Sequence, residues 1–587
     1  MTSRNGRDRQ AATDPGGAEL RELRVLDGPN LYFTRPAIKL TIDAPGWFLT
    51  DERRALALAE RVELPGATDP PGRIRPGPPG SGQRPRFVAR AAAHLTRRLA
   101  SATGRGLAVR ARPGTEPCQV IVAYPWLRRS AAEAFGNQVV AIMDAAATSR
   151  RSVPRAIEDA ARRLRDVDPG PAPSVPDPTI PTVAVTGTNG KTTTVRLLAH
   201  LVREAGRNVA YSSTDGVYFQ ERLVEAGDYS GFGGAARALA QPGVDVAVLE
   251  TARGGILLRG IGTLHNDVAV VTNISADHLG LHGIHTLDQL AEVKSTILRI
   301  TRPGGWAVLN ADDPRVLAMR RVARGRPWMI SLDPDHPALR SAVAEGGRGF
   351  TVIDGRLALL APGSDPRPLI DLRDVPVTLA GLSSANVSNA MGAAAAALGI
   401  GLPENAVVRG LRTFVLDPDR NPGRTNLFEL DGRIIVVDYA HNEAGMRGLV
   451  EVCRGLCPAG RQVWLTFAAA GDRTDEIVHA LGFTAARAAD HVAVAELLRY
   501  LRGRDRDELV KRLVAGAEDG GATEVPVHPD EMHALTWMLA SSKPGDVVAV
   551  TALAQRPEIF AMLEEHGARR VGPARLRRIA ARGRQGS

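Results

Sequence analysis

Hydrophobic and polar residues change their spacing sharply near residue 190. Residues 182–186, TVAVT, alternate β-branched and small apolar side chains, which predicts a short buried strand. From Thr192 onward the apolar residues Val195, Leu198 and Leu201 recur at helical spacing. The pattern therefore predicts a strand that gives way to a helix across residues 187–190.

Further apolar runs follow this strand, separated by stretches with helical spacing. We predict strands at residues 244–249, 268–272 and 306–309. Strands that alternate with helices are typical of a doubly wound parallel sheet, which places this region in the α/β class. Ligands of such sheets bind beyond the carboxyl ends of the strands, so the polar residues that follow these strands should converge.

The flanking regions predict two smaller domains. On the N-terminal side, two strands around a Gly28-Pro29-Asn30 turn, helices at 87–102 and 130–147 and a strand at 118–124 indicate an α+β domain. On the C-terminal side, strands at 434–437, 463–467, near Val492 and at 547–551 indicate a second, smaller parallel sheet with a Rossmann-like arrangement.

Composition shifts set the expected domain boundaries, because segments rich in Pro and Gly do not pack. We expect a disordered segment at 1–20, the α+β domain at 21–167, a linker at 168–181, the central α/β domain at 182–415, the C-terminal domain at 416–565 and a basic tail at 566–587.

Composition is that of an ordinary globular protein, with 44% hydrophobic and 24% charged residues. No apolar run is long enough to span a bilayer, and the N-terminus lacks the apolar core of a secretory signal. We therefore expect a cytoplasmic protein that does not enter a membrane. Cys118, Cys453 and Cys457 are too few for a disulfide framework and are expected to be reduced.

The net charge of +10 raises the question of nucleic-acid binding. Residues 568–587 carry seven arginines and no acidic residue, and such tails are usually solvated and weakly ordered. No zinc pattern or interleaving of aromatic and basic residues supports nucleic-acid recognition, so nucleic acid is not the expected partner. Docking of a polyanion or an acidic product on the tail is left open.

Candidate chemistry begins at the predicted turn, Gly187-Thr188-Asn189-Gly190. The start of the following helix presents unpaired N–H groups and a positive dipole end, which together form a phosphate cradle. Lys191 is placed to reach the β and γ phosphates of a nucleotide, and the Thr192 hydroxyl to bind their Mg²⁺. The strict P-loop pattern has glycine where this chain has Val185, and a glycine-rich turn with a surface lysine is the alternative.

Polar residues after the next strands extend this candidate site. Glu250 ends the strand at 244–249 and is placed to hold Mg²⁺, unless it only caps the following segment. Asn273, Asp277 and His278 cluster after the strand at 268–272, and His278 offers a ligand for a second metal unless it is structural. Lys294 lies beside the buried face of a helix that Thr286 and Gln289 begin with a capping box.

Eight segments in order carry a resemblance to a known family: TGTNGKTTT, SSTDGVY, VAVLETARGGILLRGIG, VVTNISADHLGLHGI, LDQLAEVK, VLNADDP, VVDYAHNEAG and GDRTDE. Over residues 182–555 the chain resembles the Mur ligase superfamily, and within it the Mur-like part of cyanophycin synthetases. The N-terminal domain resembles theirs more faintly. An ATP-grasp module precedes the Mur-like part in those enzymes, and here only the linker around 168–181 takes its place.

The resemblance implies roles for individual residues. Gly187, Thr188, Asn189, Gly190, Lys191, Thr192 and Thr193 would bind ATP, with Asn386, Arg424, Asp438 and His441 contributing from later segments. Thr192 and Glu250 would bind one Mg²⁺, and His278 a second one toward which a carbamoylated Lys294 would bridge. Arg253, Asp472 and Arg473 would face the substrate, and a surface ion pair is the alternative for Asp472 and Arg473.

The expected activity is therefore that of an ATP-dependent acid–amino acid ligase that performs a single ligation through an acyl phosphate. An acidic peptide with arginine as the amine is the substrate pair that the resemblance suggests, and a separate ATP-grasp ligase is a candidate partner. A folylpolyglutamate-type or other Mur-type peptide ligase, a non-catalytic ATP-binding partner and a regulatory P-loop ATPase remain alternatives. Homo-oligomerisation is left open.

Overall fold

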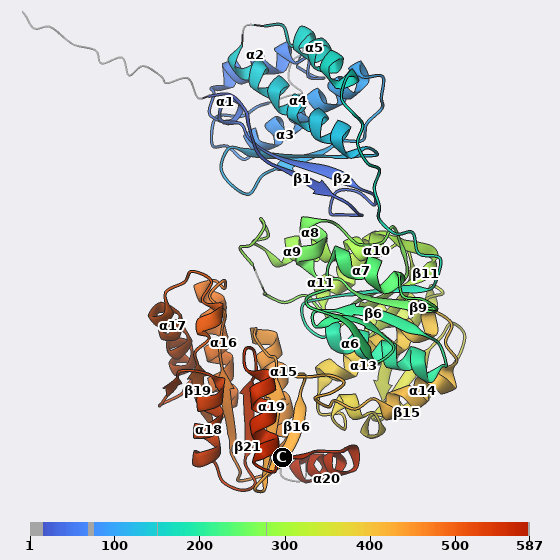
Figure 1. Ribbon diagram of the computed structural model, residues 1–587, viewed down its shortest axis with the longest axis vertical. Helices are drawn as coiled ribbons and strands as arrows, with labels where there is room; N and C mark the ends of the chain where they lie inside the picture. Colours follow the sequence, from blue (N-terminus) through green and yellow to red (C-terminus); the bar gives the residue numbers. More distant parts are fainter. Residues whose placement is uncertain (1–15, 68–74, 150, 278, 585–587) are drawn as a thin grey trace, which may run out of the picture. The chain divides into compact units, whose positions relative to one another are not determined.

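The computed structural model describes residues 16–67, 75–149, 151–277 and 279–584. The chain divides into two compact units, coloured along the sequence in Figure 1. The first unit holds the chain up to Val175 together with Leu257–Gly260, and the second holds Pro176–Ile256 and the chain from Ile261 onward.

The first unit is an α+β domain, as the sequence predicts, and the structure shows it as an antiparallel sheet with helices on one face. Its strands are β1 (Glu19–Leu26), β2 (Ala37–Asp43), β3 (Arg110–Pro113) and β4 (Gln119–Pro125), in the order β1-β2-β4-β3. Its helices are α1 (Pro45–Phe48), α2 (Glu52–Arg61), α3 (Arg84–Ala102), α4 (Arg129–Thr148) and α5 (Val153–Arg165). Alternate residues of β2 and β4, such as Leu40 and Val122, pack with Val88 of α3 and Met143 of α4 in one hydrophobic core.

The second unit begins with the predicted doubly wound sheet, which has eleven strands in the described residues. Their order is β15-β14-β13-β12-β11-β10-β5-β9-β6-β7-β8. The bounds are β5 (Thr182–Thr186), β6 (Val209–Ser213), β7 (Gly216–Phe219), β8 (Arg222–Ala226), β9 (Val246–Glu250), β10 (Asn266–Val271), β11 (Thr301–Asn310), β12 (Arg326–Ile330), β13 (Arg348–Ile353), β14 (Arg356–Leu360) and β15 (Arg367–Asp371). Strands β6 and β9 to β13 run parallel with β5, and two antiparallel hairpin extensions, β7-β8 and β14-β15, form the edges.

Helices cover this sheet because the apolar face of each helix and the apolar surface of the sheet bury one another. They are α6 (Lys191–Glu204), α7 (Phe232–Leu239), α8 (Arg253–Leu258), α9 (Leu287–Lys294), α10 (Thr296–Arg299), α11 (Pro314–Ala318), α12 (Pro337–Ala344), α13 (Ser384–Gly399) and α14 (Glu404–Thr413). Helix α9 starts at the predicted capping box, with both bonds between Thr286 and Gln289 present.

A second, seven-stranded sheet follows in the order β20-β19-β18-β21-β17-β16-β22. Its strands are β16 (Asn426–Leu430), β17 (Arg433–Asp438), β18 (Val463–Phe467), β19 (His491–Ala495), β20 (Val527–His528), β21 (Val547–Thr551) and β22 (Arg569–Arg570). Helices α15 (Glu443–Leu456), α16 (Asp475–Ala488), α17 (Arg506–Asp519), α18 (Glu531–Ser541) and α19 (Arg556–Glu565) accompany them. The predicted parallel strands β17, β18, β19 and β21 are present and adjacent.

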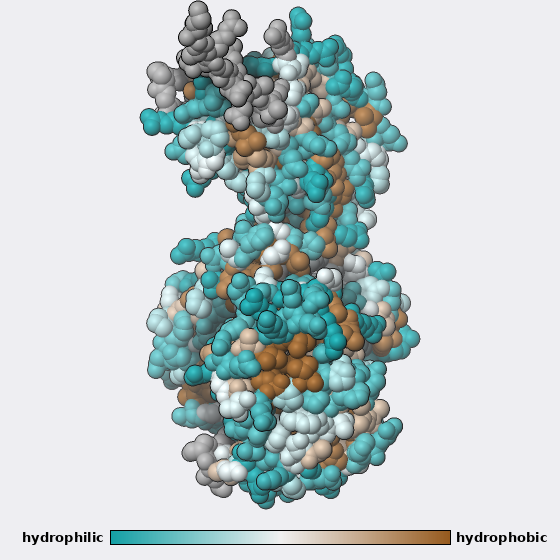
Figure 2. Space-filling model, turned by 90° about the vertical axis from the view of Figure 1, so that its left-hand side faces the viewer, coloured by the Kyte–Doolittle hydropathy of each residue, from teal (hydrophilic) through white to brown (hydrophobic). Residues whose placement is uncertain are grey.

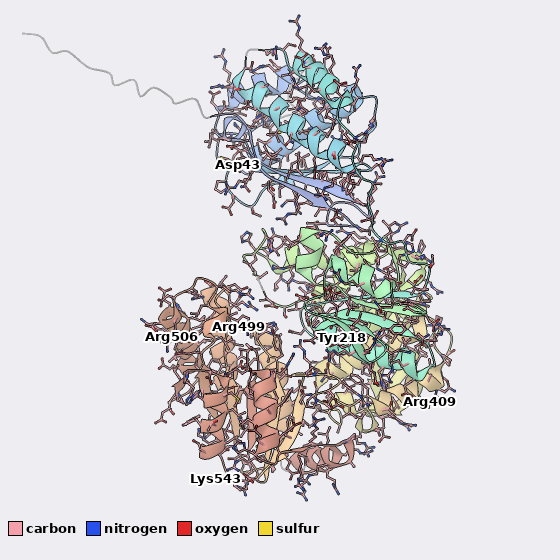
Figure 3. The ribbon with its side chains drawn as sticks, viewed as in Figure 1. Asp43, Tyr218, Arg409, Arg499, Arg506 and Lys543 are labelled. Atoms are coloured by element: carbon pink, nitrogen blue, oxygen red, sulfur yellow. The ribbon has the colours of Figure 1, made fainter. Side chains whose placement is uncertain are left out.

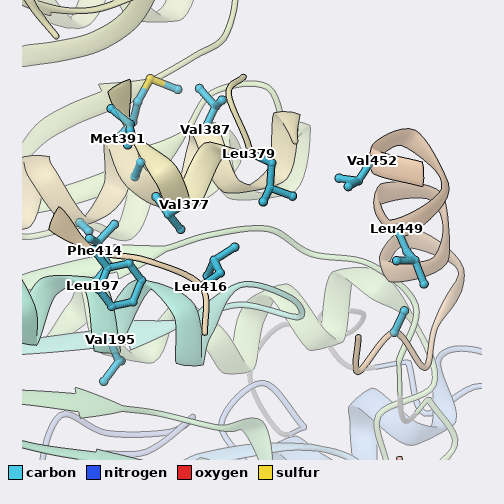
Figure 4. Close-up of a cluster of buried hydrophobic side chains, with 14 of the residues drawn as sticks. Val195, Leu197, Val377, Leu379, Val387, Met391, Phe414, Leu416, Leu449 and Val452 are labelled. Carbon is cyan, nitrogen blue, oxygen red and sulfur yellow. The ribbon is translucent and has the colours of Figure 1, made fainter. Parts of the chain in front are cut away.

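One hydrophobic core joins the two sheets of the second unit. It includes Val195 and Leu197 of α6, Leu379 just before α13, Val387 of α13, and Leu449 of α15. Figure 4 shows Leu449 and Val452 on one side of this cluster and Leu379 on the other. Packing of the middle of α15 against residues near α13 therefore holds this helix close to the central sheet.

The prediction of a weakly ordered basic tail is wrong. Residues Pro573–Arg584 form helix α20, in which Leu576, Ile579 and Ala580 are buried at helical spacing. Arg575 pairs with Glu429 at 2.8 Å, and Arg577 pairs with Asp374 at 2.8 Å. An arginine-rich segment folds here because its few apolar residues lie on one face and its arginines on the others.

The hydropathy of the surface and the state of the cysteines agree with what the composition predicts. The face in Figure 2 is mostly hydrophilic, with one compact hydrophobic patch in its lower half. Among the described residues, no helix is both long and apolar enough to cross a membrane. Cys118, Cys453 and Cys457 are all free thiols, as predicted.

Candidate active site

The predicted glycine turn lies between β5 and α6. Gly187 and Gly190 have φ values of 148° and 83°, a range that side chains disfavour. A Cβ atom at Gly187 would overlap the Thr272 hydroxyl, and one at Gly190 would overlap the Asn389 amide. The two glycines are therefore required by backbone conformation and by close approach, and they leave the first N–H groups of α6 facing the turn. We call residues 187–193 the phosphate loop.

The end of β10 holds the phosphate loop in place. Asn273 accepts a hydrogen bond from the Asn189 backbone N–H (2.9 Å) and donates its side-chain amide to the Asn189 carbonyl (3.0 Å). The Thr272 hydroxyl donates to the same carbonyl at 2.6 Å, and the Thr188 N–H donates to the Asn273 carbonyl at 2.9 Å. Asn273 is thus a support of the loop.

Thr192 and Glu250 meet at the mouth of the loop. The Thr192 hydroxyl donates to Glu250 Oε2 at 2.9 Å, and Glu250 is only 2% exposed. The other carboxylate oxygen, Oε1, is buried and accepts no hydrogen bond from the described residues. Burial raises the pKa of Glu250, and the positive charge of Lys191 opposes this shift. A buried carboxylate oxygen with no donor suits an oxygen ligand for Mg²⁺, so these two residues fit such an ion.

Two lysines face the same turn. Lys191 Nζ donates to the Thr188 carbonyl at 2.8 Å, and Lys294 Nζ donates to the Gly187 carbonyl at 2.6 Å. Lys294 is 4% exposed and does not reach solvent. Burial, and after it the charge of Lys191, holds the pKa of Lys294 well below its usual value. His278, the predicted ligand of a second metal, lies outside the described residues.

The C-terminal sheet brings three predicted residues toward this region. The Arg424 guanidinium lies over the Tyr439 ring, 4.5 Å from its centroid. Asp438 Oδ2 accepts from the Thr425 N–H at 2.7 Å and from its hydroxyl at 2.8 Å, while burial raises the pKa of Asp438. His441 Nε2 lies 3.5 Å from Asp277 Oδ2. The last contact joins the C-terminal segment to the loop that follows β10.

The three residues predicted to face the substrate are also close to Asp277. Arg473 is 7% exposed and lies 3.2 Å from Asp277 Oδ1, and it pairs with Asp472 as well. The ion pair is therefore buried and not a surface pair. Burial lowers the pKa of Arg253, and the charge of Asp277 opposes the shift, which places Arg253 in the same electrostatic environment.

Asn386 is positioned indirectly. Its side-chain carbonyl accepts from Asn389 Nδ2 at 3.0 Å, and Asn389, one turn further along α13, is the residue that approaches Gly190. Sequence reasoning chose Asn386 and missed Asn389. The helical spacing of the two asparagines was a signal that both face the turn.

A second residue missing from the predicted site is Asn442. It is fully buried, and its side chain exchanges two hydrogen bonds with Asn189 of the phosphate loop, both at 3.0 Å. A third missed group links α6 to the C-terminal segment: Asp215 pairs with Arg196 at 2.9 Å and with Arg556 at 3.4 Å. Arg196 also donates to the hydroxyl of Tyr218, which Figure 3 labels.

The described residues contain no cluster of three or more His, Cys, Asp or Glu side chains that would hold a metal alone. Oxygen ligands from a nucleotide would complete the coordination that Thr192 and Glu250 begin. The arrangement as a whole is a glycine turn at the start of a helix, surrounded by lysines and by carboxylates from both sheets of the unit.

Comparisons with known proteins match both parts of the second unit. The family model of the Mur ligase middle domain matches residues 185–397, and that of the Mur ligase glutamate ligase domain matches residues 423–553. The UDP-N-acetylmuramoyl-L-alanyl-D-glutamate–2,6-diaminopimelate ligase of Alkalilimnicola ehrlichii is 30% identical over 433 residues, which cover 72% of this chain and 78% of that enzyme.

Cyanophycin synthetases are more similar in sequence but longer. That of Synechocystis sp. is 40% identical over 374 residues, which cover 63% of this chain and 42% of that protein. The chain thus matches less than half the length of this relative. A solved structure of bifunctional folylpolyglutamate synthase/dihydrofolate synthase covers 65% of this chain and 89% of its own, with 20% identity and a TM-score of 0.49, which is too low to support an inference.

Proposed function

The chain belongs to the Mur ligase family, and from this membership we propose that it is an ATP-dependent ligase that joins a carboxylate to the amino group of an amino acid. The observation that carries the proposal is the Thr192–Glu250 pair, with its buried, unpartnered carboxylate oxygen at the mouth of the phosphate loop. No structural role explains that oxygen, whereas a metal ion accompanying a triphosphate does.

In the proposed reaction, the substrate carboxylate attacks the γ-phosphorus of ATP, and ADP leaves. The amino group then attacks the acyl phosphate, phosphate leaves, and the amine loses a proton as the amide forms. The N–H groups of the phosphate loop and Lys191 stabilise the negative charge on the transferred phosphoryl group. Bound Mg²⁺ would supply further neutralisation of that charge, held by Thr192 and Glu250.

The buried position of Lys294 is evidence that this residue, once modified, is a ligand of a second metal ion. Its buried amine has a pKa well below the usual value, so the neutral form is available to react with CO₂. Attack of the nitrogen on CO₂ forms an N–C bond and releases a proton, leaving a carbamate whose single negative charge is shared by two oxygens. We propose that this carbamate and His278 hold a second Mg²⁺.

The remaining predicted residues receive roles from their positions. Arg424, Asp438 and His441 lie at the amino and carboxyl ends of the C-terminal strands and would contact the nucleotide, with Asn386 and Asn389 on the central side. Arg253 and Arg473 are cations near the partly exposed Asp277, and together with Asp472 they would receive an acidic substrate or the acyl phosphate.

The substrates follow from the cyanophycin synthetase relatives. We propose an acidic peptide as the carboxylate and a basic amino acid, arginine first, as the amine. The described residues hold one site of this type, which supports one ligation for each turnover, and a separate ATP-grasp ligase is a candidate source of the acid. A folylpolyglutamate-type activity is the less favoured reading, because sequence similarity to cyanophycin synthetases is higher.

Phosphate release from ATP and Mg²⁺ tests the proposal, with amino acids and short Asp-containing peptides as substrates and mass analysis of the products. We expect release only when acid and amine are both present. Lys191→Ala is expected to lower the rate by about 100-fold or more while the protein stays folded, because it removes a cation from the transferred phosphoryl group. Unchanged turnover in that variant would refute the site, and release stimulated by DNA alone would favour a regulatory ATPase.

A further inference from the structure

The phosphate loop and the C-terminal segment are joined by a pair of asparagines that are 253 positions apart. Asn189 Nδ2 donates to Asn442 Oδ1, and Asn442 Nδ2 donates to Asn189 Oδ1, each at 3.0 Å. Asn442 is fully buried, so water does not compete for these bonds.

The orientation of the Asn442 amide is fixed by a third bond. Asn442 is the N-cap of α15, and its Oδ1 accepts from the Gly445 N–H at 2.9 Å. Capping alone is served equally well by Asp or Ser, which offer the same acceptor. Only the contact with Asn189 uses the Nδ2 donor, so the amide at position 442 serves the loop as well as the helix.

The partner, Asn189, is held rigidly from the central side. Its N–H and its carbonyl are bound by Asn273, and the carbonyl is bound again by Thr272. The backbone of residue 189 therefore cannot move without breaking the support of the loop, and its side chain is the part that extends to α15. Residues 188 and 190 on either side belong to the proposed phosphate cradle.

We propose that Asn442 is a positioning residue for the ligation: through Asn189 it couples the nucleotide-bound state of the phosphate loop to the placement of the C-terminal segment. The inference rests on the proposed function, since it assumes that a nucleotide occupies the loop. When the loop is ordered, the side chain of Asn189 is fixed, and through Asn442 it fixes the start of α15. Residues Asp438 to His441 directly precede this point in the chain, so they are held near the site as well. The neutral pair also spares the loop a charge that would oppose phosphate.

The test compares hydrogen exchange in two peptides, 187–193 and 439–446, with and without Mg²⁺ and the ATP analogue AMPPNP. In the wild-type protein we expect the analogue to slow exchange in both peptides. Asn442→Ser keeps a neutral N-cap and removes both bonds to Asn189. In this variant we expect slowing in 187–193 only, with the analogue's effect on 439–446 reduced about tenfold.

Two further variants separate coupling from helix capping. Asn189→Ala is expected to have the same effect on 439–446 as Asn442→Ser, and the double variant no more than either alone, because each acts through the other. Asp505→Asn exchanges the N-cap residue of α17, where the cap accepts from Glu508 N–H, and is expected to leave both peptides unchanged.

The results distinguish this inference from the proposed function. The analogue could slow exchange in 439–446 of Asn442→Ser as much as in the wild-type protein, or the losses of protection in the two single variants could add in the double variant. Either result would show that the coupling is wrong, while the ligase assignment would stand. If the analogue fails to protect 187–193 in the wild-type protein, the loop is not the nucleotide site, and both the proposed function and the inference fall.

Discussion

Replacing Glu250 by glutamine should stabilise the protein without metal and remove its stabilisation by metal and nucleotide. The amide keeps an oxygen that accepts the 2.9 Å bond from Thr192 and removes a buried charge whose other oxygen has no donor in the described residues. A buried charged group costs more than a buried neutral amide, and an unsatisfied buried group itself costs about 1–3 kcal/mol. Removing the charge should therefore raise the free energy of unfolding by about 1–2 kcal/mol near neutral pH.

The sign of the pH dependence follows from the raised pKa of Glu250. Below the unfolded-state pKa of about 4.3, the carboxyl group is protonated in both states and carries no penalty. As pH rises through that value toward the folded-state pKa, the unfolded state loses its proton first, so stability falls. The advantage of Glu250→Gln should therefore be small near pH 4 and complete above the folded-state pKa.

Adding Mg²⁺ and AMPPNP should reverse the order of stability. A ligand at 100 times its Kd stabilises the protein that binds it by about 2.7 kcal/mol. Thermal unfolding should show this stabilisation in the wild-type protein. In Glu250→Gln, the part of the stabilisation that depends on Mg²⁺ should be lost. If the variant is less stable without ligand, or keeps the full Mg²⁺-dependent gain, Glu250 is a structural residue and not a metal ligand.

Glu531 provides the matched control. It is also a buried glutamate whose pKa burial raises, but its two oxygens accept the N–H groups of Leu553, Ala554 and Gln555. Glutamine would place an NH₂ group against one of these donors, so Glu531→Gln should lose about 3 kcal/mol. The shared direction of the pKa shift thus predicts nothing by itself, and the hydrogen-bond partners decide the sign.

Two further predictions concern Lys294 and helix α20. If Lys294 is carbamoylated, phosphate release should fall when dissolved CO₂ is removed and recover when bicarbonate is added. Lys294→Arg should be inactive with and without CO₂. A rate independent of CO₂ in the wild-type protein would contradict the modification. Ending the chain at residue 572 should lower the free energy of unfolding in urea by about 3–5 kcal/mol, because Leu576 and Ile579 are buried; exposed Arg578→Ala is the control, and a truncated protein of full stability would contradict the role of α20.

Much of the fold was predictable because hydrophobic spacing is a local signal. Strands β5, β17, β18 and β21 and the turn into α6 lie where the apolar residues place them. The antiparallel edges formed by β7-β8 and β14-β15 were not predicted, since edge strands such as β8 are largely exposed and lack an apolar period. Helix α20 was missed because its arginine content outweighed three apolar residues at helical spacing.

The residues of the candidate site also differ in whether local sequence signals identify them. Thr192 and Glu250 could be selected from the sequence because each lies where a helix begins or a strand ends at the carboxyl edge of the central sheet, and parallel strands bring such positions together. The role of Lys294 came from the family resemblance. Asn389 was missed although its spacing from Asn386 signals that both face the turn, because nothing local shows which of the two comes into contact with Gly190.

Contacts between the two sheets were beyond sequence reasoning for a further physical reason. Asn442 reads locally as an ordinary N-cap, and the cap bond to Gly445 accounts fully for an acceptor at that position. Arg473 likewise reads as one half of a pair with its neighbour Asp472, and only the fold shows that it also meets Asp277. In both residues one polar atom satisfies a local need and another serves a distant partner. Such double use follows from bringing loop ends together over a sheet, and it is where positioning residues of this site should be sought.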